Sequence, residues 1–130
     1  MADTGPPAPG AGFNEMVGIP DGEGADGAAT LTLATEEGHL NPAGTVHGGA
    51  IATLIDVVMG RAVASVFEGD ERPVTIEIKV NFLEAGQVGE LVAESRVSRR
   101  GRRFMVVHAD VTQRETGETV AEAIGTFTRA

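Results

Sequence analysis

His47, Gly48, Gly49 and Asp56 have residue types and spacings that suit chemistry on a carbonyl group. The two glycines stand where a helix is predicted to begin, and the first N–H groups of a helix have no acceptor within it. Because the positive end of the helix dipole lies there, the position suits an anion or a developing oxyanion. The alternative is a tight turn before the helix, with His47 packed against its neighbours. The glycine pair alone does not exclude it.

Asp56 is the only acidic residue between Gly48 and Phe67, and its neighbours are leucine, isoleucine and valine. A buried carboxylate costs free energy unless it is paired or hydrogen-bonded, and such groups collect at functional sites. The structural alternative is an ion pair with Arg61, but the i+5 spacing is poorer than i+4 for contact on one helix face. We therefore favour a general base or nucleophile acting on a carbonyl held at the helix start.

The elements that must position these residues follow from the hydropathy pattern. Residues 48–67 have apolar side chains all round and predict one long, buried helix. The preceding segment, 28–35, alternates as a short strand does. In 74–82 the odd-numbered residues, including Thr75, form the polar face of a strand and the even-numbered ones its apolar face. Further strands are predicted over 91–98, 104–113 and 119–129.

A long apolar helix followed by a meander of strands has few packing solutions. The sheet must curl around the helix and bury it, which is an α+β architecture. We expect residues 28–130 to form this domain and residues 1–27 to be a flexible tail with one short helical turn near 13–19. The other face of the sheet and the helix end require a cover, so at least a dimer is expected.

Composition excludes several function classes. The 130 residues include 10 basic and 19 acidic ones, a net charge of −9, which disfavours nucleic-acid binding. The absence of cysteine removes disulfides, thiolate metal sites and cysteine nucleophiles. His39 and His108 are interpreted as structural or surface residues, and no cluster of histidine with carboxylates predicts a metal site. No stretch suits a signal peptide or a membrane span, so a cytoplasmic protein without membrane contact is expected.

Several motifs follow one another in a characteristic order. Asn41 comes first, then His47-Gly48-Gly49, Asp56 and Gly60, then the strand sequence 74–83, and finally a basic turn over 99–103. From about Leu31 to the C-terminus, this pattern resembles the hotdog-fold acyl-CoA thioesterases of the phenylacetic-acid-degradation (PaaI) type. The resemblance implies a curved antiparallel sheet wrapped around a long central helix. It also implies homodimers or homotetramers with active sites at the subunit interface.

The implied activity is hydrolysis of an acyl-CoA thioester with an aromatic or short- to medium-chain acyl group. CoA would be part of the substrate, and no cofactor is expected. By the resemblance, Asp56 is general base or nucleophile, the Gly48 N–H polarises the carbonyl, and Asn41 holds the carbonyl or the water. His47 orients its neighbours, and Thr75 lies near the attacking water. Asn41, His47 and Gly48 of one subunit would face Asp56 and Thr75 of the other.

Substrate-binding roles are predicted for five further residues: Gly49, Phe82, Arg100, Gly101 and Arg102. Four of the ten positive charges lie within 99–103. Such a turn is usually a solvated loop, but the resemblance places it near the CoA nucleotide, and arginine forks suit phosphate. Apolar candidates for the acyl pocket are Met59, Val63, Phe67 and Phe82.

Two other functions are alternatives for this fold. A hotdog dehydratase would carry a proline-rich segment around the histidine and a glutamate further along the helix, and neither is present. A non-catalytic acyl-CoA binding module would normally be joined to a DNA-binding domain, for which the predicted N-terminal tail is too short. Hydrolysis is therefore favoured over both.

Overall fold

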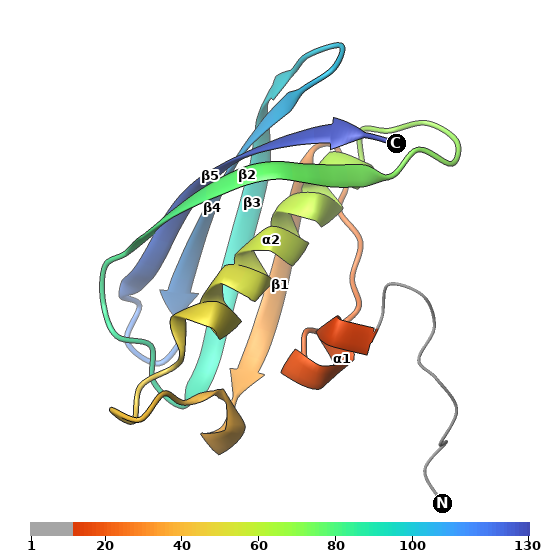
Figure 1. The fold of residues 1–130 in the computed structure, drawn as a ribbon. Helices are drawn as coiled ribbons and strands as arrows, with labels where there is room; N and C mark the ends of the chain where they lie inside the picture. Colours follow the sequence, from red (N-terminus) through yellow and green to blue (C-terminus); the bar gives the residue numbers. More distant parts are fainter. Residues whose placement is uncertain (1–11) are drawn as a thin grey trace, which may run out of the picture.

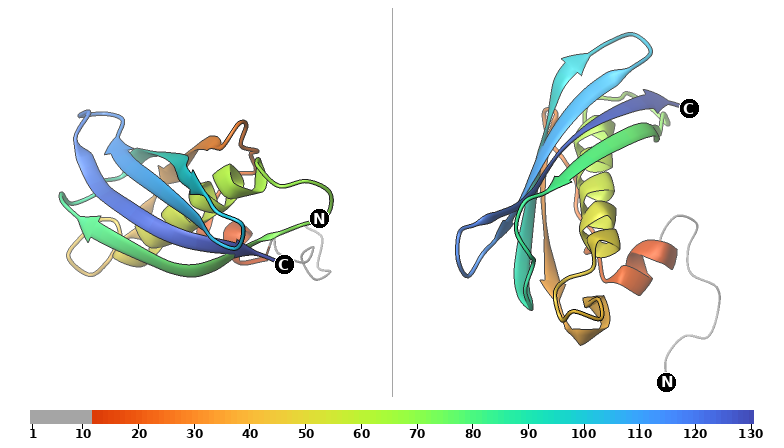
Figure 2. Two further views of the ribbon diagram at one scale, coloured as in Figure 1. Left: turned by 90° about the horizontal axis from the view of Figure 1, so that it is seen from above. Right: turned by 60° about the vertical axis from the view of Figure 1, so that its left-hand side comes forward.

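The computed structural model describes residues 12–130, which form two helices, one 3-10 turn and five strands. In chain order these are α1 (Gly12–Val17), β1 (Ala28–Thr35), the turn Glu37–His39, α2 (Gly48–Ala64), β2 (Pro73–Phe82), β3 (Gly89–Arg100), β4 (Met105–Gln113) and β5 (Thr119–Arg129). The strands form one antiparallel sheet in the order β1-β3-β4-β5-β2. The sheet curves around α2 (Figures 1 and 2), as the predicted α+β hotdog fold requires.

The core lies between the sheet and one stripe of α2. Apolar residues three and four apart on the helix face the sheet and are fully or almost fully buried: Ile51, Leu54, Ile55, Val58, Met59, Ala62 and Val63. Alternate residues of the strands supply the opposite wall. Strand β5 approaches the helix closely at Gly125, where a Cβ atom would lie 2.9 Å from the sulfur of Met59.

The expectation that the helix is buried all round is wrong for the single chain. The sheet covers one side only, so Ala52, Thr53, Asp56, Val57 and Gly60 on the other side are half-buried. The helix also ends at Ala64, three residues earlier than predicted, and Ser65 caps it. These half-buried residues form what we call the open face of α2.

The prediction of a simple meander after the helix is wrong, because β2 and β3 are not neighbours in the sheet. Strand β2 pairs with β5 at one edge, and β3 pairs with β1 and β4. The connection after β2 folds back against the segment before α2, because the Val46 N–H donates to the Gly86 carbonyl at 2.8 Å. A connection held in this way carries the chain across to β3 instead of closing a tight hairpin.

Strand β2 contains an irregularity that reverses the predicted orientation of Thr75. Thr75 pairs with the buried Phe127, but Glu77 pairs with Thr126, so Ile76 is the extra residue of a bulge. Directly opposed residues share one face of a sheet, so Thr75 points toward the helix together with Phe127. Ile76 is consequently 53% exposed. The predicted alternation holds only beyond the bulge, from Ile78 onward.

The predicted short helical turn near 13–19 forms as α1, which ends at Val17 and is followed by Gly18 with φ +87°. The N–H groups of Gly18 and Ile19 both donate to the Asn14 carbonyl at 2.9 Å. Ile19 is buried in the core, which fixes this end of the segment. Residues 20–27 of the predicted tail are also held to the fold, since the Gly27 N–H donates to the Ser65 hydroxyl at 2.9 Å. Residues 1–11 lie outside the described residues. No helix within 12–130 is long and apolar enough to cross a membrane.

Candidate active site

Asp56 lies on the open face of α2, and Thr75 reaches it from β2. The Thr75 hydroxyl donates to Oδ1 of Asp56 at 2.7 Å, a length typical of charge-assisted hydrogen bonds. Arg61 forms no ion pair with this carboxylate, and within residues 12–130 its buried Nε has no partner. The ion pair that the sequence offered as the structural partner of Asp56 is therefore not formed. The carboxylate is oriented by a hydroxyl group.

An open hollow of about 360 Å³ lies beside this pair. Its wall comes from α1, α2 and β2: Phe13, Asn14, Ala52, Thr53, Asp56, Val57, Thr75 and Ile78. We call it the Asp56 hollow. Its volume is at the small end of the range for ligand pockets. It can therefore place a small acyl group beside the carboxylate.

The start of α2 forms a second group of predicted site residues. His47 caps the helix, and its Nδ1 accepts the Gly49 N–H at 2.7 Å. A Cβ atom on residue 49 would lie 2.9 Å from that nitrogen, so glycine permits the cap. The Gly48 N–H has no acceptor among residues 12–130, and the Phe82 ring lies beside Gly48, 3.4 Å from where a Cβ atom would be. One N–H of the helix start is thus free to polarise a carbonyl.

Asn41 shapes the loop before this helix. Its Oδ1 accepts the N–H groups of Ala43 and Thr45, and its Nδ2 donates to the Thr45 hydroxyl at 2.9 Å. A side-chain amide has two N–H donors, so one of them is left for a ligand. The predicted role in holding the carbonyl or the water stays a prediction, with that second N–H as its means.

Within one chain the two groups of site residues do not meet. Gly48 and Asp56 are eight residues apart on the same helix, which at 1.5 Å per residue separates them by about 12 Å. An attacking water and the carbonyl oxygen of one thioester lie much closer than this. The structure thus brings Asp56 to Thr75, and His47 to Gly48 and Gly49, as two half-sites.

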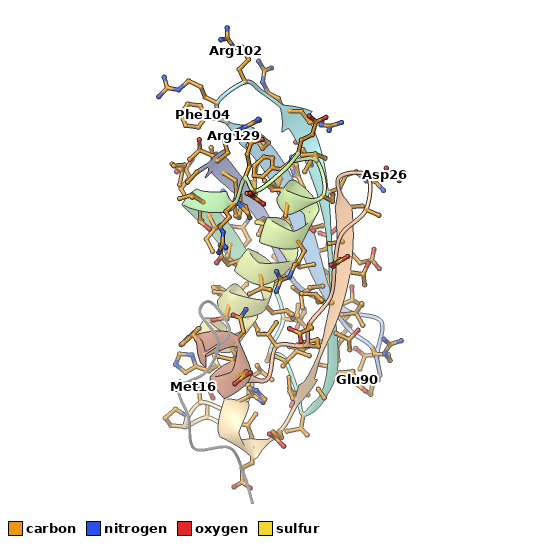
Figure 3. All side chains as sticks on the ribbon, turned by 90° about the vertical axis from the view of Figure 1, so that its right-hand side faces the viewer. Met16, Asp26, Glu90, Arg102, Phe104 and Arg129 are labelled. Atoms are coloured by element: carbon orange, nitrogen blue, oxygen red, sulfur yellow. The ribbon has the colours of Figure 1, made fainter. Side chains whose placement is uncertain are left out.

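The basic turn between β3 and β4 is exposed. A Cβ atom on residue 101 would lie 2.5 Å from the Phe104 carbonyl oxygen, which explains why the turn needs Gly101. The Arg103 guanidinium stacks on the Phe104 ring at 5.3 Å, while the side chain of Arg102 projects away from the fold. Figure 3 shows Arg102 and Met16 at opposite ends of the molecule. The predicted contact with CoA stays a prediction.

Three of the four apolar candidates for the acyl pocket lie elsewhere. Met59 and Val63 are fully buried in the core, since they belong to the stripe that faces the sheet. Phe67 packs under the Arg129 guanidinium, 4.9 Å from its ring centroid. Phe82 is exposed, but it lies at the helix start beside Gly48.

Sequence reasoning missed Phe13 and Asn14, which line the Asp56 hollow from α1. Local pattern could not reveal them, because nothing near residue 13 indicates where the short helix docks. His39 has the structural role expected of it, since its ring links the Val17 carbonyl to the Glu36 N–H. Across residues 12–130, no group of three or more histidine, cysteine, aspartate or glutamate side chains could hold a metal ion.

The sequence profile of the Thioesterase superfamily matches residues 43–120, a segment that contains His47, Asp56 and Thr75. The chain belongs to this superfamily. Human acyl-coenzyme A thioesterase 13 is 28% identical over 99 residues, which cover 75% of this chain and 70% of that protein. The predicted hotdog-fold family and its enzyme class, thioesterase, are confirmed by this membership.

Solved structures agree with the fold. The conserved protein PA5202 from Pseudomonas aeruginosa has a TM-score of 0.86 at 36% identity, covering 95% of this chain and all of that one. The BH2602 protein from Bacillus halodurans, solved with CoA, has a TM-score of 0.80 at 29% identity. The match covers 91% of this chain and 75% of that one. The Escherichia coli PaaI protein has a TM-score of 0.82 at 24% identity, covers 91% and 83%, and supports the fold alone.

Proposed function

We propose that this thioesterase hydrolyses acyl-CoA thioesters, with Asp56 as its general base or nucleophile. The observation that carries the proposal is the Thr75–Asp56 hydrogen bond, which orients the carboxylate at the wall of a hollow of acyl-group size. The names of two similar proteins support CoA as the thiol part: a human acyl-coenzyme A thioesterase and a Bacillus halodurans protein solved with CoA.

In the general-base form, Asp56 takes a proton from water while the water oxygen attacks the thioester carbon. The carbonyl oxygen becomes an oxyanion that accepts a hydrogen bond from the Gly48 N–H. Collapse of this intermediate breaks the carbon–sulfur bond, and the CoA sulfur leaves with the proton that Asp56 held. The products are a carboxylic acid and CoA. In the nucleophile form, the Asp56 carboxylate attacks the thioester carbon, the carbon–sulfur bond breaks and CoA leaves as its thiolate. Water then hydrolyses the anhydride to the carboxylic acid and the Asp56 carboxylate, and the proton released goes to the thiolate.

The separation of about 12 Å between Gly48 and Asp56 supports a site shared between two chains. Strand β2 offers an edge for the second chain, since it borders the sheet and exposes Val74 and Ile76. An edge strand also presents unpaired N–H and C=O groups on which another strand can pair. In a two-fold homodimer each chain would lend its helix start to the other's Asp56. A homotetramer of such dimers and a cytoplasmic location belong to the same proposal.

The test is a panel of aryl-, short- and medium-chain acyl-CoAs assayed for release of free thiol. The purified chain should cleave members of the panel, and Asp56→Asn should lower turnover at least about a hundredfold, as loss of a catalytic carboxylate does. Asparagine preserves shape, so thermal unfolding and oligomeric state should not change. Parental turnover in this variant would refute the role of Asp56. Binding of acyl-CoA without thiol release would favour a binding module.

A further inference from the structure

Two hollows lie against the open face of α2, and both are lined by Phe13 of α1. One is the Asp56 hollow. The other, which we call the α1 hollow, measures about 460 Å³ and lies between α1, the turn after β1 and the start of α2. Its apolar wall includes Met16, Val17, Leu40 and Ala50. Thr53 is the only other residue that the two hollows share, so Phe13 and Thr53 stand at their boundary.

The Phe13 side chain contributes little to the core. It is 62% exposed, and α1 contains no buried residue. The helix is fixed instead at its other end, where His39 contacts the Val17 carbonyl and Ile19 enters the core. An apolar ring held over a hollow beside a carboxylate, without a role in folding, points to contact with a ligand.

We propose that Phe13 is the end wall of the acyl pocket and limits the length of the acyl chain. This inference rests on the proposed function, which requires the thioester carbon to lie next to Asp56. From that point the acyl group extends into the Asp56 hollow, whose apolar walls are Phe13, Ala52, Val57 and Ile78. The ring closes this space before it joins the α1 hollow.

The walls also indicate the chemical class of the acyl group. An aromatic ring or a short chain fits a space of about 360 Å³, and the Phe13 ring can pack against an aromatic acyl group. Neither hollow is lined by lysine or arginine, whereas Glu15, Glu36 and Asp56 line them. A second carboxylate on the acyl group would therefore be repelled. The substrate class is an acyl-CoA whose acyl group is compact and uncharged.

The test compares butanoyl-CoA, phenylacetyl-CoA and decanoyl-CoA with the parent chain and with Phe13→Ala. Removing the ring joins the two hollows, so a ten-carbon chain gains a place to lie. The ratio of kcat/KM for decanoyl-CoA to that for butanoyl-CoA should rise about tenfold or more, since apolar pockets discriminate chain length by factors of roughly this size. Activity on phenylacetyl-CoA should fall, because its ring loses a neighbour.

Two control variants separate the ring from the helix that carries it. Phe13→Leu keeps a bulky apolar side chain and should keep a ratio close to the parental one. Met16 lies on the same helix, is 83% exposed and lines only the α1 hollow. Met16→Ala should therefore also keep the parental ratio of kcat/KM values. Thermal unfolding of all three variants checks that the fold is intact.

Each outcome decides one question. If the parent releases no thiol from any acyl-CoA, the proposed function fails. If the parent is active but Phe13→Ala keeps the parental ratio, the function stands and Phe13 is not the end wall. If the decanoyl-to-butanoyl ratio of kcat/KM rose equally in Phe13→Ala and Met16→Ala, loosening of α1 would explain it. That result would overturn the assignment to the Phe13 ring.

Discussion

The Thr75 hydroxyl donates a hydrogen bond to the Asp56 carboxylate at 2.7 Å, although strict alternation along β2 would place Thr75 on the opposite face. The bulge at Ile76 makes the contact possible. Bulges next to active sites commonly re-aim a side chain in this way. The relationship ties a local irregularity of a strand to the orientation of the carboxylate.

Thr75→Val should retain the shape of the side chain and lose the hydrogen bond to Asp56. Turnover should fall about tenfold, less than for Asp56→Asn, because the carboxylate remains but is no longer oriented. Thr75→Ser keeps the hydroxyl and should retain most of the activity. Steady-state kinetics of thiol release measure both variants. A larger loss in Thr75→Ser than in Thr75→Val would show that the methyl group, and not the hydroxyl, is what matters.

Much of the fold was predictable from the sequence, because hydropathy periods report which side of an element is covered. The strand bounds and the single long helix followed from such periods. The bulge at Ile76 could not be predicted, since Thr75 is polar and fits the polar face of a regular strand. The pairing of β2 with β5 was also missed, because periodicity carries no information on which strands are neighbours.

The candidate site was predicted in part. Asp56 stood out as a lone carboxylate in an apolar helix, and the order of motifs added Thr75. The contribution of α1 was not predictable, because Phe13 reaches the hollow beside Asp56 only through tertiary packing. The choice of Met59 and Val63 as acyl-pocket residues failed for the same reason. Met59 and Val63 are apolar helix residues like Val57, and only the position of the sheet decides which of them face the core.

Gly48→Pro should remove one N–H from the helix start while leaving the helix in place. Proline suits the first helical position, and His47 has the extended backbone, φ −60° and ψ 135°, that a residue before proline prefers. Loss of an oxyanion donor should lower kcat about 100-fold or more. Gly48→Ala is the matched control, since its Cβ would make an ordinary 3.4 Å contact with Phe82 and the N–H stays. Circular dichroism checks the helix. Similar activity in both variants would remove this N–H from the mechanism.

Mixing Gly48→Pro chains with Asp56→Asn chains should restore activity if the two half-sites come from different subunits. A mixed dimer then contains one site with both defects and one intact site. Random exchange at equal concentrations should give about a quarter of the parental activity, because half of the dimers are mixed. Subunit exchange is followed separately with a mass-tagged chain. Exchange without recovery would mean that each site is built within one chain.

Replacing Arg100 and Arg102 together with alanine should raise KM for acyl-CoA and leave kcat nearly unchanged. The turn projects from the end of the fold opposite α1, so contacts to the nucleotide would be the same in ground and transition states (Figure 3). A short thioester of N-acetylcysteamine lacks the nucleotide, and its KM should not respond. Arg114→Ala, in the other exposed hairpin, controls for the loss of a surface arginine away from the turn. Equal effects on both substrates would identify the turn as a solvated loop.

Glu115 gives the chain a pH-dependent contribution to stability away from the candidate site. Hydrogen bonds from the Gln113 amide, at 2.7 Å, and from the Glu90 N–H lower the pKa of this carboxyl below 4.5. Because the pKa of Glu115 is lower in the folded state, ionised Glu115 stabilises the fold at pH values above its pKa in the unfolded chain. This stabilisation is lost as pH falls through its pKa in the folded chain. The parent should therefore be more stable than Glu115→Gln at neutral pH, and the difference should shrink below about pH 4.5.

Urea midpoints of the parent and Glu115→Gln, measured at several pH values from neutral to acid, test this expectation. Glu118→Gln is the matched control, because Glu118 is an exposed carboxylate in the same hairpin. The Glu118 side chain forms no hydrogen bond among residues 12–130. Glu118→Gln should leave the midpoints nearly unchanged. Hydrolysis of acyl-CoA should be unaffected in both variants, since the hairpin lines neither hollow. A difference between parent and Glu115→Gln that stayed constant with pH would mean that shape, and not ionisation, accounts for the effect.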